Sequence, residues 1–304
     1  MTKTRKEHDL IGDMEVPKEA LWGVHTARAV ENFPITGVAI GHYRNLIKAL
    51  GLVKAAAARA NGAAGVLSED KADLIHRAAM DVANGLLDDQ FVVDAIQGGA
   101  GTSTNMNANE VIANRALEIL GKEYGDYDAI HPINDVNASQ STNDVYPTAL
   151  KIALIFEMQE LINSLITLEG AYRTKAREFS DVIKMGRTQL QDAVPMTLGQ
   201  TFEAYAITTR DDVDRLHQVI ELMTEINLGG TAIGTRINAS ATYVTEVCKE
   251  LSELTGVNLK TAENLVEATQ DTGVFVRCSN ALRVVAVKQS KISNDLRLLS
   301  SGPR

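Results

Sequence analysis

Three long runs of helical periodicity dominate the second half of the chain. From Val145 to Ser180, apolar side chains recur every three or four residues, which is the spacing of one face of a helix. The same spacing continues from Thr197 to Asn227 and from about Glu263 to Ser300. Each run is about three times the length of an average globular helix, and apolar side chains reach more than halfway round the first. Such helices need partners along their whole length, so we predict a bundle that is shared between identical subunits.

The first half of the chain has shorter predicted elements. Glycine and proline break residues 11–45 into loops, short strands and turns. Serine at position 68 is a good N-cap, and Gly121 is a good helix stop. The patterns predict a β-like run at Phe91–Ile96 and shorter helices at Arg44–Asn61, Ser68–Leu86, Met106–Leu120 and Val244–Leu254. We therefore expect a mainly α fold, with an N-terminal mixed helical domain (residues 1–140) and a long-helix bundle domain (residues 141–304).

Three polar clusters interrupt these patterns, at residues 98–109, 139–144 and 186–192. Hydroxyl and amide side chains dominate all three, and none contains a histidine. The second cluster directly precedes the first long run, where Thr142, Asn143 or Asp144 can cap the helix and Pro147 fits the first turn. A helix N-terminus carries a partial positive charge and unpaired N–H groups, so this cluster can bind a carboxylate. Capping and turn formation alone would also explain such a run.

Neutral donors of this kind can stabilise charge that develops on a carboxylate when the neighbouring carbon loses a proton. Each well-placed donor lowers the free-energy barrier of that proton removal by about 3 to 4 kcal/mol. The first cluster could instead be a nucleotide-binding loop. However, Gly99–Thr104 lacks the third glycine of the dinucleotide fingerprint, and no lysine follows at the P-loop position. Charge stabilisation on a carboxylate is therefore the favoured interpretation.

Composition narrows the class of protein. The 304 residues, 45% of them hydrophobic, can bury a substantial core, and the formal charge of −9 argues against nucleic acid or an anionic membrane as partner. Two cysteines, Cys248 and Cys278, are too few for a disulfide framework. The N-terminus has no apolar signal core, and charges interrupt every apolar run. We expect a cytoplasmic protein, and no spacing of metal ligands is visible.

The three clusters resemble the three sequence regions of the aspartase/fumarase superfamily, and the resemblance runs from about Asp9 to Arg304. The fumarase branch would have Gly-Ser-Gly-Thr in the first region, Ser-Ser-Asn-Asp in the second and histidine after the threonine in the third. This chain instead has Ala100, Thr142 and Gln189 at those places. Each difference favours the aspartase branch. A class II fumarate hydratase or another lyase of the superfamily is the alternative.

The resemblance implies reversible elimination of ammonia from L-aspartate to give fumarate, through an aci-carboxylate intermediate and without a redox or organic cofactor. By matching of motifs, Thr102, Ser141 and Thr142 would hold the aci-carboxylate. Asn143 would hold the amino group and Thr188 the α-carboxylate, while Gln189 stands where many relatives have histidine. The resemblance also implies a homotetramer whose active sites are each built from three subunits.

Two departures from the family pattern affect this expectation. The family's Gly-Ser-Ser-x-Met-Pro-x-Lys-x-Asn loop, which carries the serine base, does not occur in the sequence. We expect that base beyond Arg304, which leaves the catalytic residue unknown and predicts a truncated chain that is inactive alone. An inactive fragment or a non-catalytic helical oligomer is therefore a further alternative. The second departure is Arg236, where glycine is usual. Arginine is strained there if the backbone needs a positive φ; if it does not, Arg236 adds a local positive charge for an anionic substrate.

Overall fold

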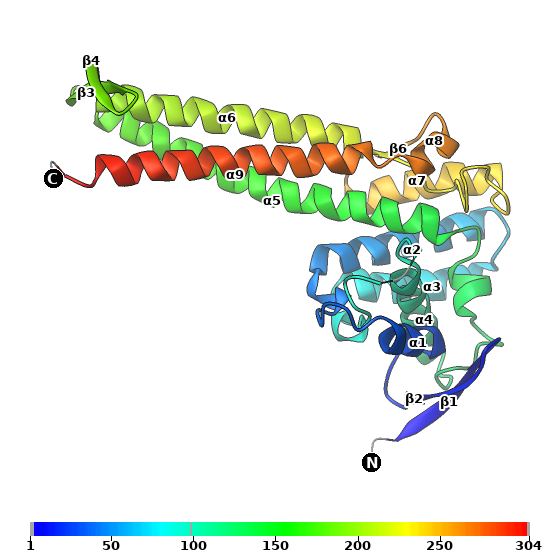
Figure 1. Ribbon diagram of the computed structural model, residues 1–304. Helices are drawn as coiled ribbons and strands as arrows, with labels where there is room; N and C mark the ends of the chain where they lie inside the picture. The colour runs from blue at the N-terminus through cyan, green and yellow to red at the C-terminus, as the bar shows by residue number, and fades with distance from the viewer. Residues whose placement is uncertain (1–2, 98, 303–304) are drawn as a thin grey trace. The chain divides into compact units, whose positions relative to one another are not determined.

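The computed structural model describes residues 3–97 and 99–302, which form two compact units (Figure 1). The first unit takes its residues from Met1–Leu154 and Thr224–Asp271, and the second from Ile155–Met223 and Thr272–Arg304. Both are mainly helical, which confirms the predicted fold class. The division into domains 1–140 and 141–304 stays a prediction. No helix within the described ranges is long and apolar enough to span a membrane.

The first unit is a cluster of helices with a small amount of sheet. Its strands form an antiparallel hairpin, β1 (Thr4–Asp9) with β2 (Gly12–Pro17), and a short parallel pair, β5 (Glu225–Ile226) with β6 (Lys260–Thr261). Its short helical turns are η1 (Ile40–His42), η2 (Asp88–Gln90) and the π-helical η3 (Pro132–Val136). Its α-helices are α1 (Val24–Asn32), α2 (Arg44–Ala63), α3 (Glu69–Ala83), α4 (Thr102–Ile119), the start of α5 (Thr142–Glu178), α7 (Ala241–Thr255) and α8 (Leu265–Gln270).

Helix α2 is the centre of this unit and packs against α3 and α7. Its small side chains allow close approach: a Cβ on Gly51 would lie 2.6 Å from the backbone nitrogen of Ala83 in α3. Ser68 caps α3, as predicted, by accepting a hydrogen bond from the backbone N–H of Lys71 at 3.4 Å. The alanine-rich sequence thus produces a tightly packed helix pair.

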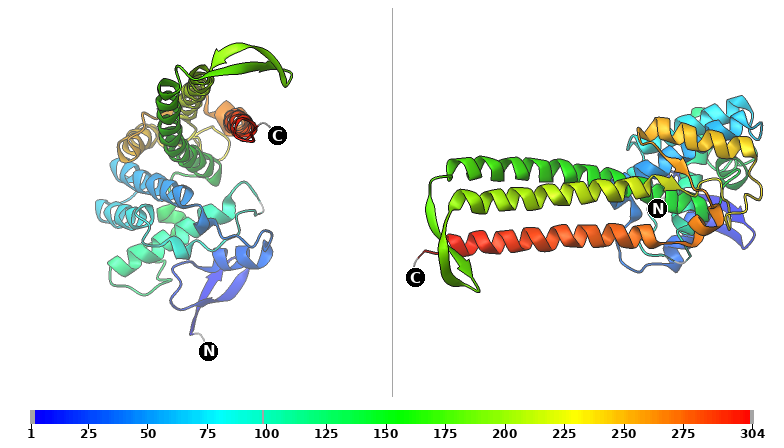
Figure 2. Two further views of the ribbon diagram at one scale, coloured as in Figure 1. Left: turned by 90° about the vertical axis from the view of Figure 1, so that its left-hand side faces the viewer. Right: turned by 90° about the horizontal axis from the view of Figure 1, so that it is seen from above.

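The second unit consists of three long helices and a hairpin at one end (Figure 2). It contains most of α5 (Thr142–Glu178), the antiparallel strands β3 (Ile183–Thr188) and β4 (Gln191–Thr197), α6 (Leu198–Met223) and α9 (Gly273–Leu299). Its core includes Tyr172, Tyr205 and Ile292, one from each long helix. An ion pair at 3.0 Å between Arg173 and Glu203 also joins α5 to α6.

Several predicted elements are corrected. The run from Glu263 to Ser300 is two helices, α8 and α9, because the backbone at Asp271 is extended. Apolar spacing continues across that break, so periodicity alone could not detect it. Residues 91–96 form only an isolated bridge from Asp94 to Ala39, and the run from Thr197 to Asn227 is helical only at Leu198–Met223. Helix α4 begins earlier than predicted, at Thr102.

Candidate functional site

The start of α5 presents three of the predicted substrate-binding residues, Ser141, Thr142 and Asn143, which we call the donor turn. The Ser141 hydroxyl accepts a hydrogen bond from the Asn143 N–H at 3.3 Å, and the Ser141 N–H donates to Asp144 Oδ1 at 2.9 Å. This reciprocal pair is a capping box. The cap is therefore Ser141 and not one of the three residues that follow it, because α5 already begins at Thr142.

Pro147 lies in the second turn of α5 instead of its first. It has no N–H to donate to the carbonyl of Asn143, and that carbonyl accepts a hydrogen bond from Asn227 Nδ2 at 3.0 Å. The Asn143 side chain in turn donates to the carbonyl of Ala232 at 2.7 Å. Asn143 is thus held through both its backbone and its side chain by the segment 227–232.

The first polar cluster meets the donor turn. Asn105 Nδ2 of α4 donates to the Thr142 hydroxyl oxygen at 3.2 Å. Gly101, at φ +88°, packs so closely that an added Cβ would lie 2.3 Å from Cγ of Tyr146 in α5. Thr102, the first residue of α4, is exposed to solvent, and Gly98 lies outside the described residues. The N-termini of α4 and α5 are therefore joined, and both favour an anion.

Two buried charged side chains, Lys54 and Asp144, lie next to the donor turn. Sequence analysis gave Asp144 only as a possible helix cap in the second polar cluster and did not single out Lys54. Lys54 of α2 donates from Nζ to Asn137 Oδ1 at 3.0 Å and to Gln140 Oε1 at 2.9 Å. Asp144 Oδ2 accepts hydrogen bonds from the backbone N–H groups of Gly229 and Thr231 at 3.0 and 2.9 Å. The sequence signal that could have identified Lys54 is its position as a lysine within the alanine-rich, apolar sequence of α2.

Burial shifts the pKa values of Lys54 and Asp144 in the directions that favour their neutral forms. It lowers the pKa of Lys54 to about 7 and raises the pKa of Asp144 to about 6. The attraction between the two charges opposes each of these pKa shifts, and hydrogen bonds from three N–H groups also oppose that of Asp144. Each charge is therefore within electrostatic reach of the other.

The third polar cluster forms the β3–β4 hairpin of the second unit, an element that the sequence did not predict. Gln189 and Leu190 make its two-residue turn, with φ of +51° and +65°. Thr188 and Gln189 are both exposed. Gln189 also lines a cavity of about 430 Å³ together with Lys184, Arg187 and Lys291. The predicted substrate-binding residues thus fall in both units: Thr102 and the donor turn in the first, Thr188 and Gln189 in the second.

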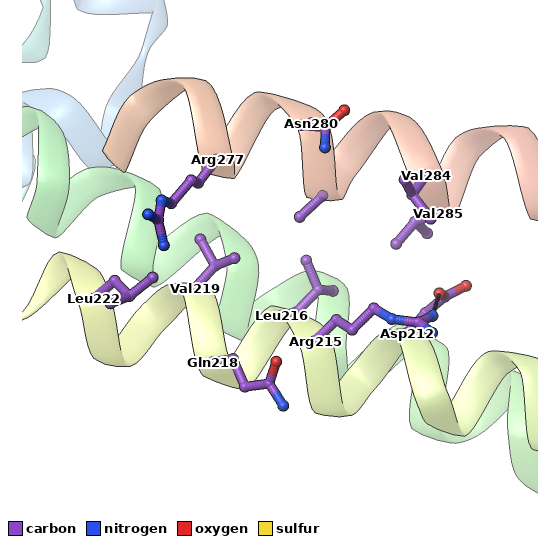
Figure 3. A pocket seen from close by; sticks show the side chains of 11 residues that line it. Asp212, Arg215, Leu216, Gln218, Val219, Leu222, Arg277, Asn280, Val284 and Val285 are labelled. Carbon is purple, nitrogen blue, oxygen red and sulfur yellow. Dashed lines mark hydrogen bonds and ion pairs between the residues drawn. The ribbon is translucent and has the colours of Figure 1, made fainter. Parts of the chain in front are cut away.

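A second cavity of the second unit, about 290 Å³, lies between α6 and α9 (Figure 3). Its walls are mostly apolar, with Leu216 and Val219 contributed by α6 and Val285 by α9. The buried carboxylate of Asp212 contributes charge, but it is already paired with Lys288 and Arg215. This cavity therefore offers mainly packing surface.

Comparisons with known proteins identify the family. Residues 12–304 match the family described as Lyase. Aspartate ammonia-lyase from Pseudomonas aeruginosa is 55% identical over 305 residues, and that from a Bacillus species is 50% identical over 303 residues. Each alignment covers 100% of this chain and 64% of the relative, so the chain spans less than two thirds of their length.

Solved structures give the same result. The fumarate lyase:delta crystallin from Brucella melitensis, bound to cobalt, has a TM-score of 0.98 and 58% identity, over 99% of this chain and 66% of that one. A class II fumarase from Schistosoma mansoni has a TM-score of 0.92 and 33% identity over the same shares. The chain therefore belongs to the lyase family, within the aspartase/fumarase superfamily that its three polar clusters resemble.

Proposed function

We propose that this chain carries substrate-binding donors of an aspartate ammonia-lyase, which converts L-aspartate reversibly to fumarate and ammonia. One observation carries the proposal: Asn105 of α4 holds the Thr142 hydroxyl of α5, so two helix N-termini and their neutral donors meet at one place. The relatives support the choice of substrate, since those that are 50 to 55% identical are named aspartate ammonia-lyase.

The donors would act on charge that appears during the reaction. A base removes a proton from the carbon beside the β-carboxylate, and the electron pair moves onto that carboxylate to form the aci-carboxylate dianion. The pair then returns to form the carbon–carbon double bond as the carbon–nitrogen bond breaks and ammonia leaves. Thr102, Ser141 and Thr142 would stabilise the dianion, each donor contributing about 3 to 4 kcal/mol. The donor turn itself contains no base, so its role is binding and charge stabilisation.

The remaining roles are assigned by the family motifs. Asn143 would hold the substrate amino group and Thr188 its α-carboxylate, while Gln189 stands where many relatives have histidine. Thr188 and Gln189 belong to a different unit from the donor turn. In line with the family resemblance, we propose that one active site draws on several subunits of a homotetramer. The exposed apolar side chains of the long helices, such as Val276 and Val287, support such an assembly. We propose the cytoplasm as its location.

Fumarate hydration is the second candidate, supported by the class II fumarase that is 33% identical. The two reactions differ in whether ammonia or water adds to fumarate. Gln189, Ala100 and Thr142 are the residues that favour ammonia.

The test follows fumarate by its ultraviolet absorbance as the purified chain is mixed with L-aspartate, while its intact mass is measured on the same sample. Fumarate binding is measured in parallel by isothermal titration calorimetry, because binding requires the donors but not the base. We expect fumarate to bind, and Thr142→Val to weaken binding at least tenfold. Any turnover should consume aspartate and not malate.

Thr167→Val is the matched control, because the Thr167 hydroxyl lies on the same helix and donates only to the carbonyl of Asn163. It should bind fumarate as the unaltered chain does. Formation of malate from fumarate would show that the chain is a fumarase and would contradict the proposal. Absence of both fumarate binding and turnover would favour a non-catalytic helical oligomer.

A further inference from the structure

We propose that Asp144, held opposite Lys54, is a positioning residue that fixes the geometry of the donor turn for substrate. The inference rests on the function proposed above, but its structural part can be tested without it. Asp144 faces away from solvent and is fully buried, so it acts through the donors and does not touch substrate itself.

The Asp144 carboxylate connects two segments that are far apart in the sequence. One oxygen accepts the Ser141 N–H at 2.9 Å, and the other accepts the N–H groups of Gly229 and Thr231 at 3.0 and 2.9 Å. Thr231 has a positive φ of +60°, an unfavourable conformation for a β-branched residue. A backbone held in that state needs surrounding contacts to maintain it, and the Asp144 bond supplies one. The carboxylate therefore fixes both the donor turn and the loop against which Asn143 is anchored.

Only a carboxylate satisfies all three N–H groups. An asparagine has one side-chain oxygen, so its NH₂ group would face at least one of these donors and leave it without an acceptor. A buried N–H that loses its acceptor bears the full cost of desolvation. With asparagine at position 144, we therefore expect either the Ser141 side or the Gly229–Thr231 side to open.

Lys54 supplies the opposite charge that a buried carboxylate requires. The titratable groups that face Asp144 are Lys54 from α2 and Tyr243 from α7, and the pKa of Tyr243 is raised by burial and by the negative charge of Asp144. Tyr243 is thus neutral, which leaves Lys54 as the counter-charge.

Lys54 also reaches the donor turn by a second path. Its ammonium group and the Asn105 amide both donate to Asn137 Oδ1, at 3.0 and 3.1 Å. The same Asn105 amide donates to the Thr142 hydroxyl. The lysine and the aspartate therefore hold the donor turn from its two sides.

The experiment compares Asp144→Asn with Asp9→Asn in the full 304-residue chain. Asp9 is a matched control, because it also accepts two backbone N–H groups, from Ile11 and Gly12, and faces a cation, Arg28. Hydrogen–deuterium exchange is measured over residues 139–146 and 227–233, and fumarate affinity by calorimetry. We expect Asp144→Asn to accelerate exchange at least tenfold in one or both segments and to weaken fumarate binding at least tenfold. Asp9→Asn should change neither.

The double variant Lys54→Met/Asp144→Asn separates positioning from general stability, and it decides the matter if Asp144→Asn does not fold. In Asp144→Asn the buried charge of Lys54 has no opposite charge beside it. The double variant removes that charge as well, so its resistance to urea should be higher than that of Asp144→Asn. Fast exchange at the donor turn and weak fumarate binding should persist. If the double variant recovers urea resistance, slow exchange and fumarate binding together, the pair only stabilises the fold and the proposal is overturned. Unchanged exchange in a folded Asp144→Asn variant would overturn it too. If the unaltered chain does not bind fumarate, the proposed function fails, while the exchange data still decide whether Asp144 fixes the donor turn.

Discussion

The two units bury their side chains in opposite ways. The first buries many polar groups and gives them partners, including the side chains of Lys54, Asn107, Glu110, Asn114 and Asp144. In the second, burial differs between the long helices: α9 buries only Cys278, Val285 and Ile292, whereas α6 buries nine residues. The second unit also exposes large apolar side chains, such as Val276 and Val287, which are 66% and 64% exposed.

This difference indicates that the two units obtain their order from different sources. In the first, close packing and paired polar groups hold a particular local geometry, as a set of aligned donors requires. In the second, long helices present apolar faces that the described chain does not cover, as expected of surfaces that pack against other subunits. The first unit should therefore be sensitive to small substitutions, and the second tolerant of them.

The sharpest test of this contrast is Gly101→Ala in the first unit. The new Cβ would lie 2.3 Å from Cγ of Tyr146, and φ is +88°. Overpacking and the positive φ together should lower the free energy of unfolding by about 3 kcal/mol. Gly121→Ala is the control, because φ there is +76° but no atom lies within 4 Å of the new Cβ, so it should cost only about 1 kcal/mol. Equal losses in urea titrations would show that packing at Gly101 is loose.

A second test uses the buried charges of the first unit. The folded-state pKa of Lys54 is about 7, below its ordinary value of 10.5, so the unfolded chain binds more protons between these two values. Stability must therefore rise with pH above 7, by about 2 kcal/mol between pH 7 and 9 from this residue alone. The contribution of Asp144 has the opposite slope, since its pKa of about 6 lies above 3.8 and stability falls as pH rises between them.

The measurement is urea unfolding of the unaltered chain and of Lys54→Met across this pH range. The difference between the two slopes isolates Lys54 from the other groups that titrate above pH 7. If the two chains gain the same stability from pH 7 to 9, Lys54 is not held in a desolvated site and the contrast between the units weakens.

The sequence was informative about local patterns and silent about contacts between distant segments. Helical periodicity predicted the long helices, and runs of hydroxyl and amide side chains located the donor turn, because both signals are local. Periodicity could not show that Ser141 is the cap, since the capping box depends on hydrogen bonds at the first turn. The β3–β4 hairpin was missed because its strands are largely exposed and lack an alternating pattern. The electrostatic interaction of Lys54 in α2 with Asp144 in α5 joins segments that are far apart in the sequence, which no local pattern encodes.

Arg236 tests whether the first unit tolerates strain. Its φ is +61°, so the positive φ that would strain an arginine at this position is present. Arg236→Gly should relieve it and stabilise the chain by about 1 kcal/mol or less, because glycine also gains entropy in the unfolded state. Thermal unfolding at neutral pH measures this change. Arg236→Ala is the control, since it removes the charge but keeps the strain, and it should not stabilise. A gain with alanine equal to that with glycine would assign the effect to charge.

The smallest expected effect lies in the second unit, at Gly170 of α5. This glycine is exposed, its φ is not positive, and no atom lies within 4 Å of an added Cβ. Alanine there should stabilise the helix by about 0.5 to 1 kcal/mol, because glycine loses more conformational entropy on folding. The sign is opposite to that of Gly101→Ala, so the same substitution separates a packed unit from an open one. Urea unfolding at several protein concentrations checks it: a gain at low concentration that disappears at high concentration would mean that another subunit packs against Gly170, whereas a loss at every concentration would contradict the open surface described for this unit.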